Sequence, residues 1–179
     1  TLSGSNTYTG PTSVSSGVLE LNGGLSLSNN NAVSVASGAE LKINNSEEIG
    51  SLSGSGTVRV NANQTLTVGN VVTSTFAGNM TGAGGLTVSQ TTGNTNTLTL
   101  SGNNTGLGAQ VRVINYGRLI VDGENAIGDN TPVTVNSNGI LTLLSNQTIG
   151  SLASNLANAS IQLGSFTLTT GGNDTNTSV

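Results

Sequence analysis

The stretch that decides the fold is a short strand signature that returns one coil later. It reads Ser16-Gly17-Val18-Leu19-Glu20-Leu21, and about 21 residues on it is echoed by Ser37-Gly38-Ala39-Glu40-Leu41-Lys42-Ile43. In each copy a glycine precedes apolar residues that alternate with other side chains, as in an extended strand with one buried face. The spacing predicts that equivalent strands stack on one another in successive coils.

The same alternation recurs along the whole chain, separated by clusters of Gly, Asn and Ser that suit tight corners. No segment shows convincing helical periodicity. The strand-like segments lie at 18–21, 41–43, 58–60, 66–68, 86–88, 98–100, 111–113, 119–121, 133–135, 141–143 and 161–163. We expect the inward side chains to include Leu19, Leu21, Leu41, Ile43, Val58, Val60, Leu119, Val121, Val133, Val135, Leu141 and Leu143.

The composition favours a thin core shared by stacked repeats. Gly, Asn, Thr and Ser make up 100 of the 179 residues, and only four residues are aromatic. So few large side chains suit a core that runs continuously through successive coils. We therefore predict an all-β fold, a single-stranded parallel β-helix with about 20 residues per coil. About nine coils would make a rod roughly 40 Å long.

A longer repeat of 100 residues is also visible. Residues 17–19 match 117–119, 33–35 match 133–135, 41–43 match 141–143, and Ile49-Gly50-Ser51-Leu52 returns as Ile149-Gly150-Ser151-Leu152. Four matches in one register indicate two copies of one unit. We treat 1–179 as a single β-helical segment, with the second copy starting near 98 and a polar tail at 173–179. Because Thr1-Leu2-Ser3-Gly4 reads as the middle of a repeat, we expect the natural protein to continue at least upstream.

Charge and residue content exclude several classes of function. The chain has no His and no Cys, so the usual zinc, haem and thiol chemistries lack their ligands, and we expect no cofactor. Four Lys and Arg against eight Asp and Glu argue against nucleic-acid binding. No apolar run approaches the roughly 18 residues that cross a bilayer, so direct membrane insertion is not expected.

The N-terminal residues resemble a known family. Leu2-Ser3-Gly4-Ser5-Asn6-Thr7-Tyr8-Thr9-Gly10-Pro11-Thr12-Ser13-Val14-Ser15-Ser16-Gly17-Val18-Leu19 is similar to the passenger-associated repeat of type V autotransporters. Its continuation resembles the family through residues 33–41, 49–58, 66–69 and 75–86, and 98–106 opens the next copy. The second copy departs from the pattern at Gly106-Leu107-Gly108-Ala109, where we expect a rebuilt corner.

The resemblance implies a right-handed β-helix outside a Gram-negative cell, at the surface or released, exported through an outer-membrane translocator barrel in the full-length protein. It implies a secreted passenger domain with a role in virulence. We expect a non-enzymatic stalk or scaffold acting as an adhesin, through self-association or through contact with a host-surface or other extracellular ligand. Coils that fold one by one as they emerge would support export.

The acidic residues are the main candidates for chemistry. Glu47 and Glu48 are the only adjacent pair, and we interpret them as a solvated corner because neighbouring strand residues point to opposite faces. Asp122, Glu124 and Asp129 have the spacing of a loose oxygen-rich cation site, but a charged surface loop explains them better. We expect no metal site and no catalytic residue.

Three alternatives stay open. A carbohydrate-active β-helix enzyme or a lectin-like module would need convergent carboxylates or aromatic platforms, whereas Tyr8, Phe76, Tyr116 and Phe166 are scattered. An ice-binding face would need the Thr-Leu-Thr triplets at 65–67, 97–99 and 167–169 in successive coils, and their spacing is too wide. The outward charges Glu20, Lys42 and Arg59 are expected to stack on one another as solubility devices.

Overall fold

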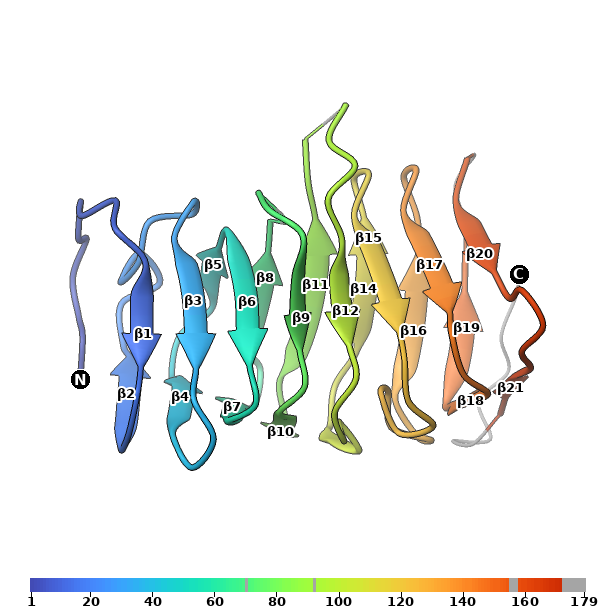
Figure 1. Ribbon diagram of the computed structural model, residues 1–179, viewed down its shortest axis with the longest axis horizontal. Coiled ribbons are helices and arrows are strands. Elements are labelled where there is room, and N and C mark those ends of the chain that lie inside the picture. The colour runs from blue at the N-terminus through green and yellow to red at the C-terminus, as the bar shows by residue number, and fades with distance from the viewer. Residues whose placement is uncertain (70, 92, 155–157, 172–179) are drawn as a thin grey trace.

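The chain forms a parallel β-solenoid. A computed structural model describes residues 1–69, 71–91, 93–154 and 158–171, so the expected tail at 173–179 lies outside the described residues. The solenoid has about seven turns of about 21 residues. The chain runs down the near face and up the far face as it advances from the N-terminal end, which is a right-handed course (Figure 1). The predicted β-helix is confirmed.

All pairs of adjacent strands in the described residues are parallel. Three long sheets form the faces of the solenoid, and a short two-stranded sheet lies near its C-terminal end. No helix that could cross a membrane occurs among the described residues. In the order of pairing, the eight-stranded sheet contains β1 (Thr12–Val14), β3 (Ala32–Val35), β6 (Ser51–Gly54), β9 (Ser74–Phe76), β12 (Leu98–Leu100), β15 (Arg118–Val121), β17 (Ile140–Leu143) and β20 (Ser160–Gln162); the five-stranded sheet contains β13 (Gly106–Leu107), β10 (Asn79–Gly82), β7 (Thr57–Val60), β4 (Glu40–Ile43) and β2 (Val18–Leu21); the six-stranded sheet contains β19 (Ser151–Ala153), β16 (Pro132–Val135), β14 (Val111–Ile114), β11 (Gly85–Ser89), β8 (Thr65–Val68) and β5 (Glu47–Ile49); and the two-stranded sheet pairs β18 (Gln147–Ile149) with β21 (Leu168–Thr170).

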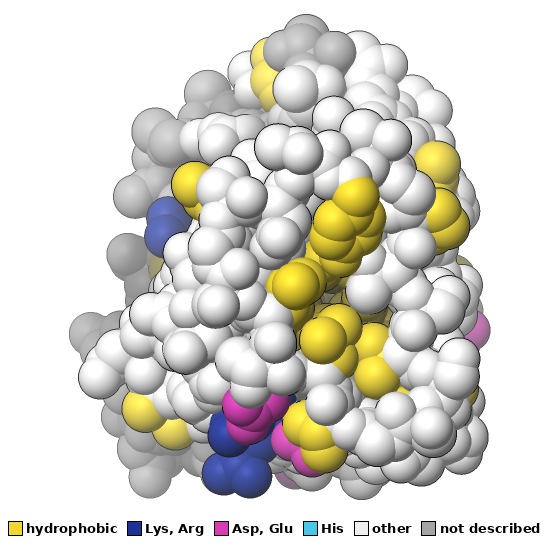
Figure 2. Space-filling model, turned by 90° about the vertical axis from the view of Figure 1, so that its left-hand side faces the viewer, with side chains coloured by type: hydrophobic (Ala, Val, Ile, Leu, Met, Phe, Trp, Pro, Cys, Tyr) yellow, Lys and Arg dark blue, Asp and Glu magenta, His cyan; other side chains and the backbone are white. Residues whose placement is uncertain are grey.

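The core is a set of apolar ladders that run along the axis. Leu19 pairs with Leu41, and Leu41 pairs with Val58 in the next coil. Every side chain predicted to face inward is buried except Leu19, which is partly buried and packs against the core from the first turn. At that end Val18 and Leu25 are each 56 % exposed, and hydrophobic side chains are visible there (Figure 2). The period-two prediction of orientation is therefore confirmed.

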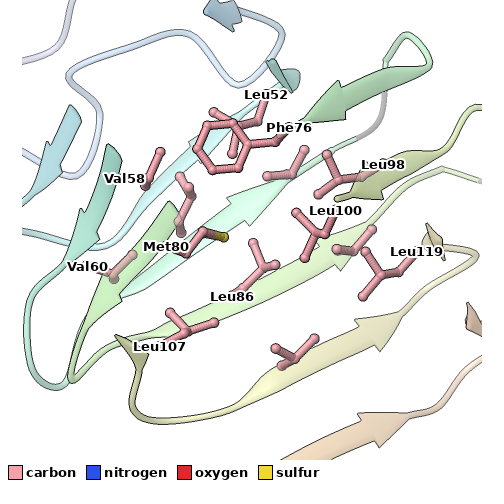
Figure 3. Packing of buried hydrophobic residues seen from close by; sticks show 14 of the residues in the cluster. Leu52, Val58, Val60, Phe76, Met80, Leu86, Leu98, Leu100, Leu107 and Leu119 are labelled. Atoms are coloured by element: carbon pink, nitrogen blue, oxygen red, sulfur yellow. The ribbon is translucent and has the colours of Figure 1, made fainter. Parts of the chain in front are cut away.

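The largest core side chain is Phe76, which is fully buried. Its neighbours include Leu52, Val58 and Leu98 (Figure 3). Phe76 pairs with Gly54 in the preceding strand of the eight-stranded sheet, so the residue beside the ring has no side chain and leaves room for it. Burying such a side chain stabilises the fold by roughly 1.5–3 kcal/mol.

The predicted number of coils was too high, because several turns are longer than 20 residues. Val33 pairs with Leu52 19 positions later, but Ser74 pairs with Leu98 24 positions later. The connection between β11 and β12 accounts for the longest turn and rises above the other corners (Figure 1). The described residues before β1 and after β20 add no further strand to the eight-stranded sheet. About seven turns result, and they span roughly 35 Å at the spacing of adjacent strands.

Segments that match across the 100-residue repeat lie on different faces. β2 of the five-stranded sheet corresponds to β15 of the eight-stranded sheet, and β3 of the eight-stranded sheet corresponds to β16 of the six-stranded sheet. Each matched strand is thirteen places further along the chain, which is four turns of three strands plus one strand. The second copy is therefore turned by one face, a third of a turn, relative to the first.

Candidate functional site

Glu47 is not on a solvated corner, so that part of the sequence interpretation was wrong. Its side chain is only 3 % exposed, and it accepts hydrogen bonds from the backbone N–H groups of Leu27 (2.8 Å) and Ser26 (3.1 Å). These donors lie 20 and 21 residues earlier, in the preceding turn. The carboxylate thus holds the loop between β2 and β3 against β5, which is a structural task.

Glu48 points to the opposite side, as the alternation of a strand requires. It is exposed and accepts a hydrogen bond from Asn29 Nδ2 at 3.0 Å. The two adjacent carboxylates therefore do not converge, and they cannot act as a paired acid and base.

Gln147 occupies the position of Glu47 in the second copy. It is 2 % exposed, and its Nε2 donates to the carbonyl oxygens of Ile127 (2.8 Å) and Glu124 (3.1 Å). The polarity of the contact is reversed: an acceptor meets backbone donors in the first copy, and a donor meets backbone acceptors in the second. Both side chains fix the equivalent loop of the preceding turn.

The acidic loop of the second copy is only partly brought together. Glu124 and Asp129 line a cleft of about 400 Å³, together with Asn146 and Thr148. Asp122 does not line this cleft. Within the described ranges, no group of three or more His, Cys, Asp or Glu side chains is placed to hold a metal ion.

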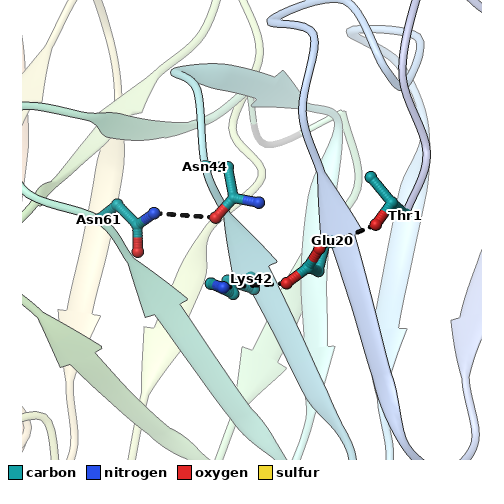
Figure 4. A network of polar contacts seen from close by, with 5 residues as sticks. All are labelled: Thr1, Glu20, Lys42, Asn44 and Asn61. Atoms are coloured by element: carbon teal, nitrogen blue, oxygen red, sulfur yellow. Dashed lines mark hydrogen bonds and ion pairs between the residues drawn. The ribbon is translucent and has the colours of Figure 1, made fainter.

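The predicted stacking of outward charges is confirmed on the five-stranded sheet. Glu20 pairs with Lys42 and Lys42 pairs with Arg59 in register. Lys42 Nζ lies 2.9 Å from Glu20 Oε1, and Thr1 Oγ1 donates to Glu20 Oε2 at 2.8 Å (Figure 4). The hydrogen bond from Lys42, then that from Thr1 and the charge of Lys42, hold the pKa of the Glu20 carboxyl below its ordinary value. Acidic and basic side chains also adjoin in the view of the N-terminal end (Figure 2).

The Thr-Leu-Thr triplets do not share a face. Thr67 lies in the six-stranded sheet, Thr99 in the eight-stranded sheet and Thr169 in the short two-stranded sheet. They therefore do not form one continuous array of hydroxyl groups.

A groove at the projecting corner is the site that the sequence did not reveal. It has a volume of about 360 Å³, and we call it the corner groove, lined chiefly by Asn29, Asn30, Glu48, Gly69, Val71, Gln90, Asn94 and Asn115. Its side chains come from residues up to 86 positions apart, because it crosses several turns of the solenoid. Single Asn residues in a chain rich in Asn gave no signal, and only the stacking of the coils brings them together.

The buried floor of the corner groove contains an incompletely paired amide. Gln90 is 7 % exposed, and its Nε2 donates to the carbonyl oxygen of Tyr116. Its Oε1 has no hydrogen-bond partner in the described part of the chain. Asn115 and Tyr116 have φ angles of 48° and 63°, and this turn directs the Asn115 carbonyl to the Gln90 N–H at 3.0 Å.

Comparison with known proteins supports one assignment. Residues 1–21 match the passenger-associated-transport-repeat family. No curated protein and no solved structure matches the chain. The repeat at the N-terminus and the β-solenoid that continues from it fit an autotransporter passenger β-helix.

Proposed function

We propose that this chain is a segment of a secreted autotransporter passenger that serves as a non-enzymatic stalk or scaffold. The observation that carries the proposal is the match of residues 1–21 to the passenger repeat, together with the core that continues from this region through the solenoid. In the full-length protein the segment is displayed at the surface of a Gram-negative cell. There it presents polar corners for adhesion, self-association or contact with a host ligand.

The carboxylates support a structural rather than a catalytic role. Glu47 is committed to two backbone N–H groups and Glu48 to Asn29. The cleft with Glu124 and Asp129 is lined by no Lys or Arg among the described residues. Glycan-cleaving enzymes need one carboxyl group as acid and a second as base or nucleophile across the scissile bond. We expect no turnover of uronate polysaccharides or common glycosides, and product formation that disappears in Asp129→Asn would contradict the scaffold function.

Stepwise folding of the coils explains how such a segment supports its own export. Each coil contacts mainly its neighbours, so a coil that emerges from the translocator barrel folds on the coil before it. Folding outside the cell then opposes backsliding without any nucleotide. Export should depend on the core ladders and be insensitive to outward side chains.

Surface display of the full-length protein tests this proposal. Leu141 is 1 % exposed, and Thr142 points outward from the same strand. We expect Leu141→Lys to lower the amount of passenger that protease can reach on intact cells, and Thr142→Lys, the matched control, to leave it unchanged. Undiminished display of Leu141→Lys would refute export by stepwise folding.

A further inference from the structure

The corner groove follows the long axis of the solenoid. Glu48 in β5, Gly69 after β8, Gln90 after β11 and Asn115 after β14 belong to four strands that are neighbours in the six-stranded sheet. Because adjacent strands lie about 4.8 Å apart, the groove extends roughly 15 Å along the axis. This shape suits a linear ligand that lies along the rod.

The chemistry of the lining suits hydroxyl groups. Asn29, Asn30, Gln90 and Asn115 contribute amides, each of which donates through nitrogen and accepts through oxygen. Sugar hydroxyls likewise donate and accept. Val71, 37 % exposed, adds an apolar surface on which the C–H face of a sugar ring can lie.

The unpartnered Gln90 Oε1 is an independent sign of a ligand. Buried polar atoms are nearly always hydrogen-bonded, and each exception calls for an explanation. The Gln90 amide is held in place through Nε2, so its oxygen remains fixed at the floor of the groove. A ligand hydroxyl that donates to this oxygen would complete the amide.

Charge and topology narrow the class of ligand. Glu48 is the one acidic residue in the described lining, which contains no Lys or Arg, so anionic sugars are repelled and not paired. An extended peptide would bind best by adding a strand to a free sheet edge. The groove lies across the corners and offers side chains instead of such an edge.

We propose that the corner groove binds a neutral, linear oligosaccharide without cleaving it. The inference rests on the proposed function and names the class of ligand that the scaffold would contact. Amides and Val71 provide the contacts, and Gln90 anchors one hydroxyl.

Titration of the purified chain with short neutral oligosaccharides tests the proposal, using cello-, xylo-, manno- and chito-oligosaccharides beside oligogalacturonate and an extended-peptide library. Gly69→Val should block the groove, since a Cβ there meets nothing closer than 3.5 Å and no positive φ forbids it. We expect at least one neutral oligosaccharide to bind the wild type, and Gly69→Val to lose detectable binding while its melting curve is unchanged.

Asn30→Ala and Asn130→Ala form a matched pair. Asn30 lines the groove, whereas Asn130 occupies the equivalent position of the second copy in a different cleft. Loss of one amide contact should weaken binding about three- to tenfold for Asn30→Ala, and Asn130→Ala should bind as the wild type does.

Three outcomes would overturn the assignment: binding of oligogalacturonate or peptide only, no binding to any probe, or binding that Gly69→Val leaves intact. Surface display of Gly69→Val in the full-length protein separates the two proposals. Normal display with no glycan binding would remove the groove assignment and leave the scaffold function standing.

Discussion

The two copies of the 100-residue repeat share their sequence pattern but not their place on the rod. Val18–Leu21 stacks in the five-stranded sheet, whereas the matching Arg118–Val121 stacks in the eight-stranded sheet. Both strands bury the same motif position, since Leu21 and Val121 are fully buried. The motif therefore specifies which side of a strand faces inward, and the number of intervening strands specifies the face.

This rotation matters for what the rod presents. Thirteen strands per copy turn each outward feature by a third of a turn, so matching loops do not form one line along the surface. Residues 29–30 contribute to the corner groove, and residues 129–130 contribute to another cleft with Thr105 and Leu107. Equal sequence does not make equal sites.

The largest expected effect tests whether the motif position alone decides burial. Leu41 and Leu141 match across the copies, are 0 % and 1 % exposed, and lie in different sheets. Leu41→Lys and Leu141→Lys should each lower the free energy of unfolding by about 4 kcal/mol or more, because each buries an unpaired ammonium group. Urea denaturation measures this. A loss in only one of the two variants would break the equivalence of the copies.

Glycines of the motif should show how the face changes the task of a residue. Gly17 has a φ of 70° and open space around it, whereas a Cβ on Gly117 would lie 2.2 Å from the Val88 carbonyl oxygen. We expect Gly117→Ala to cost about 3 kcal/mol through this clash. Gly17→Ala should cost about 1–2 kcal/mol, from backbone conformation only. Thermal melting of both variants decides, and equal losses would contradict the different corner geometries.

The buried polar residues allow an exchange between copies. Glu47→Gln places an amide against the N–H groups of Ser26 and Leu27, and we expect a loss of about 2 kcal/mol. Gln147→Glu sets a carboxylate against the carbonyls of Ile127 and Glu124, with a loss of similar size near neutral pH.

The two exchanges should differ in acid. Burial and the facing carbonyls favour the protonated form of the new acid in Gln147→Glu, so this variant should regain stability as the pH falls. Glu47→Gln introduces no titrating group and should not regain it. Denaturation at neutral and acid pH compares the variants, and a loss in Gln147→Glu that is the same at both pH values would contradict this orientation of the Gln147 amide.

The sequence predicts what depends on near neighbours in the chain. The orientation of Leu41 and Val58 follows from alternation alone, and the stacking of Glu20 on Lys42 follows from the spacing of about 21 residues. The burial of Glu47 does not, because its partners Ser26 and Leu27 lie in the preceding turn. The corner groove was missed for the same reason: its amides meet only once the turn lengths are fixed, and the long β11–β12 connection changes those lengths.

The smallest effect concerns a charge pair that only the first copy contains. Glu20 and Lys42 face each other there, and the matching residues Ile120 and Thr142 pair in the same way in the second copy. Lys42→Thr therefore gives the first copy the second copy's residue. It should raise the pKa of the Glu20 carboxyl toward its ordinary value, because Lys42 is the largest cause of the lowering. Carboxyl-detected NMR titration measures the shift.

The effect of this pair on stability has a defined sign. The pKa of Glu20 is lower in the folded state, so the stabilisation is fully present above the unfolded-state value of about 4.5. It is lost as the pH falls through the lower folded-state value. Lys42→Thr should thus narrow the small difference in melting temperature between neutral and acid solution, and added salt should narrow it in the wild type. The matched control Thr142→Ser in the second copy should change neither, and a change there would show that the acid response does not come from the Glu20–Lys42 pair.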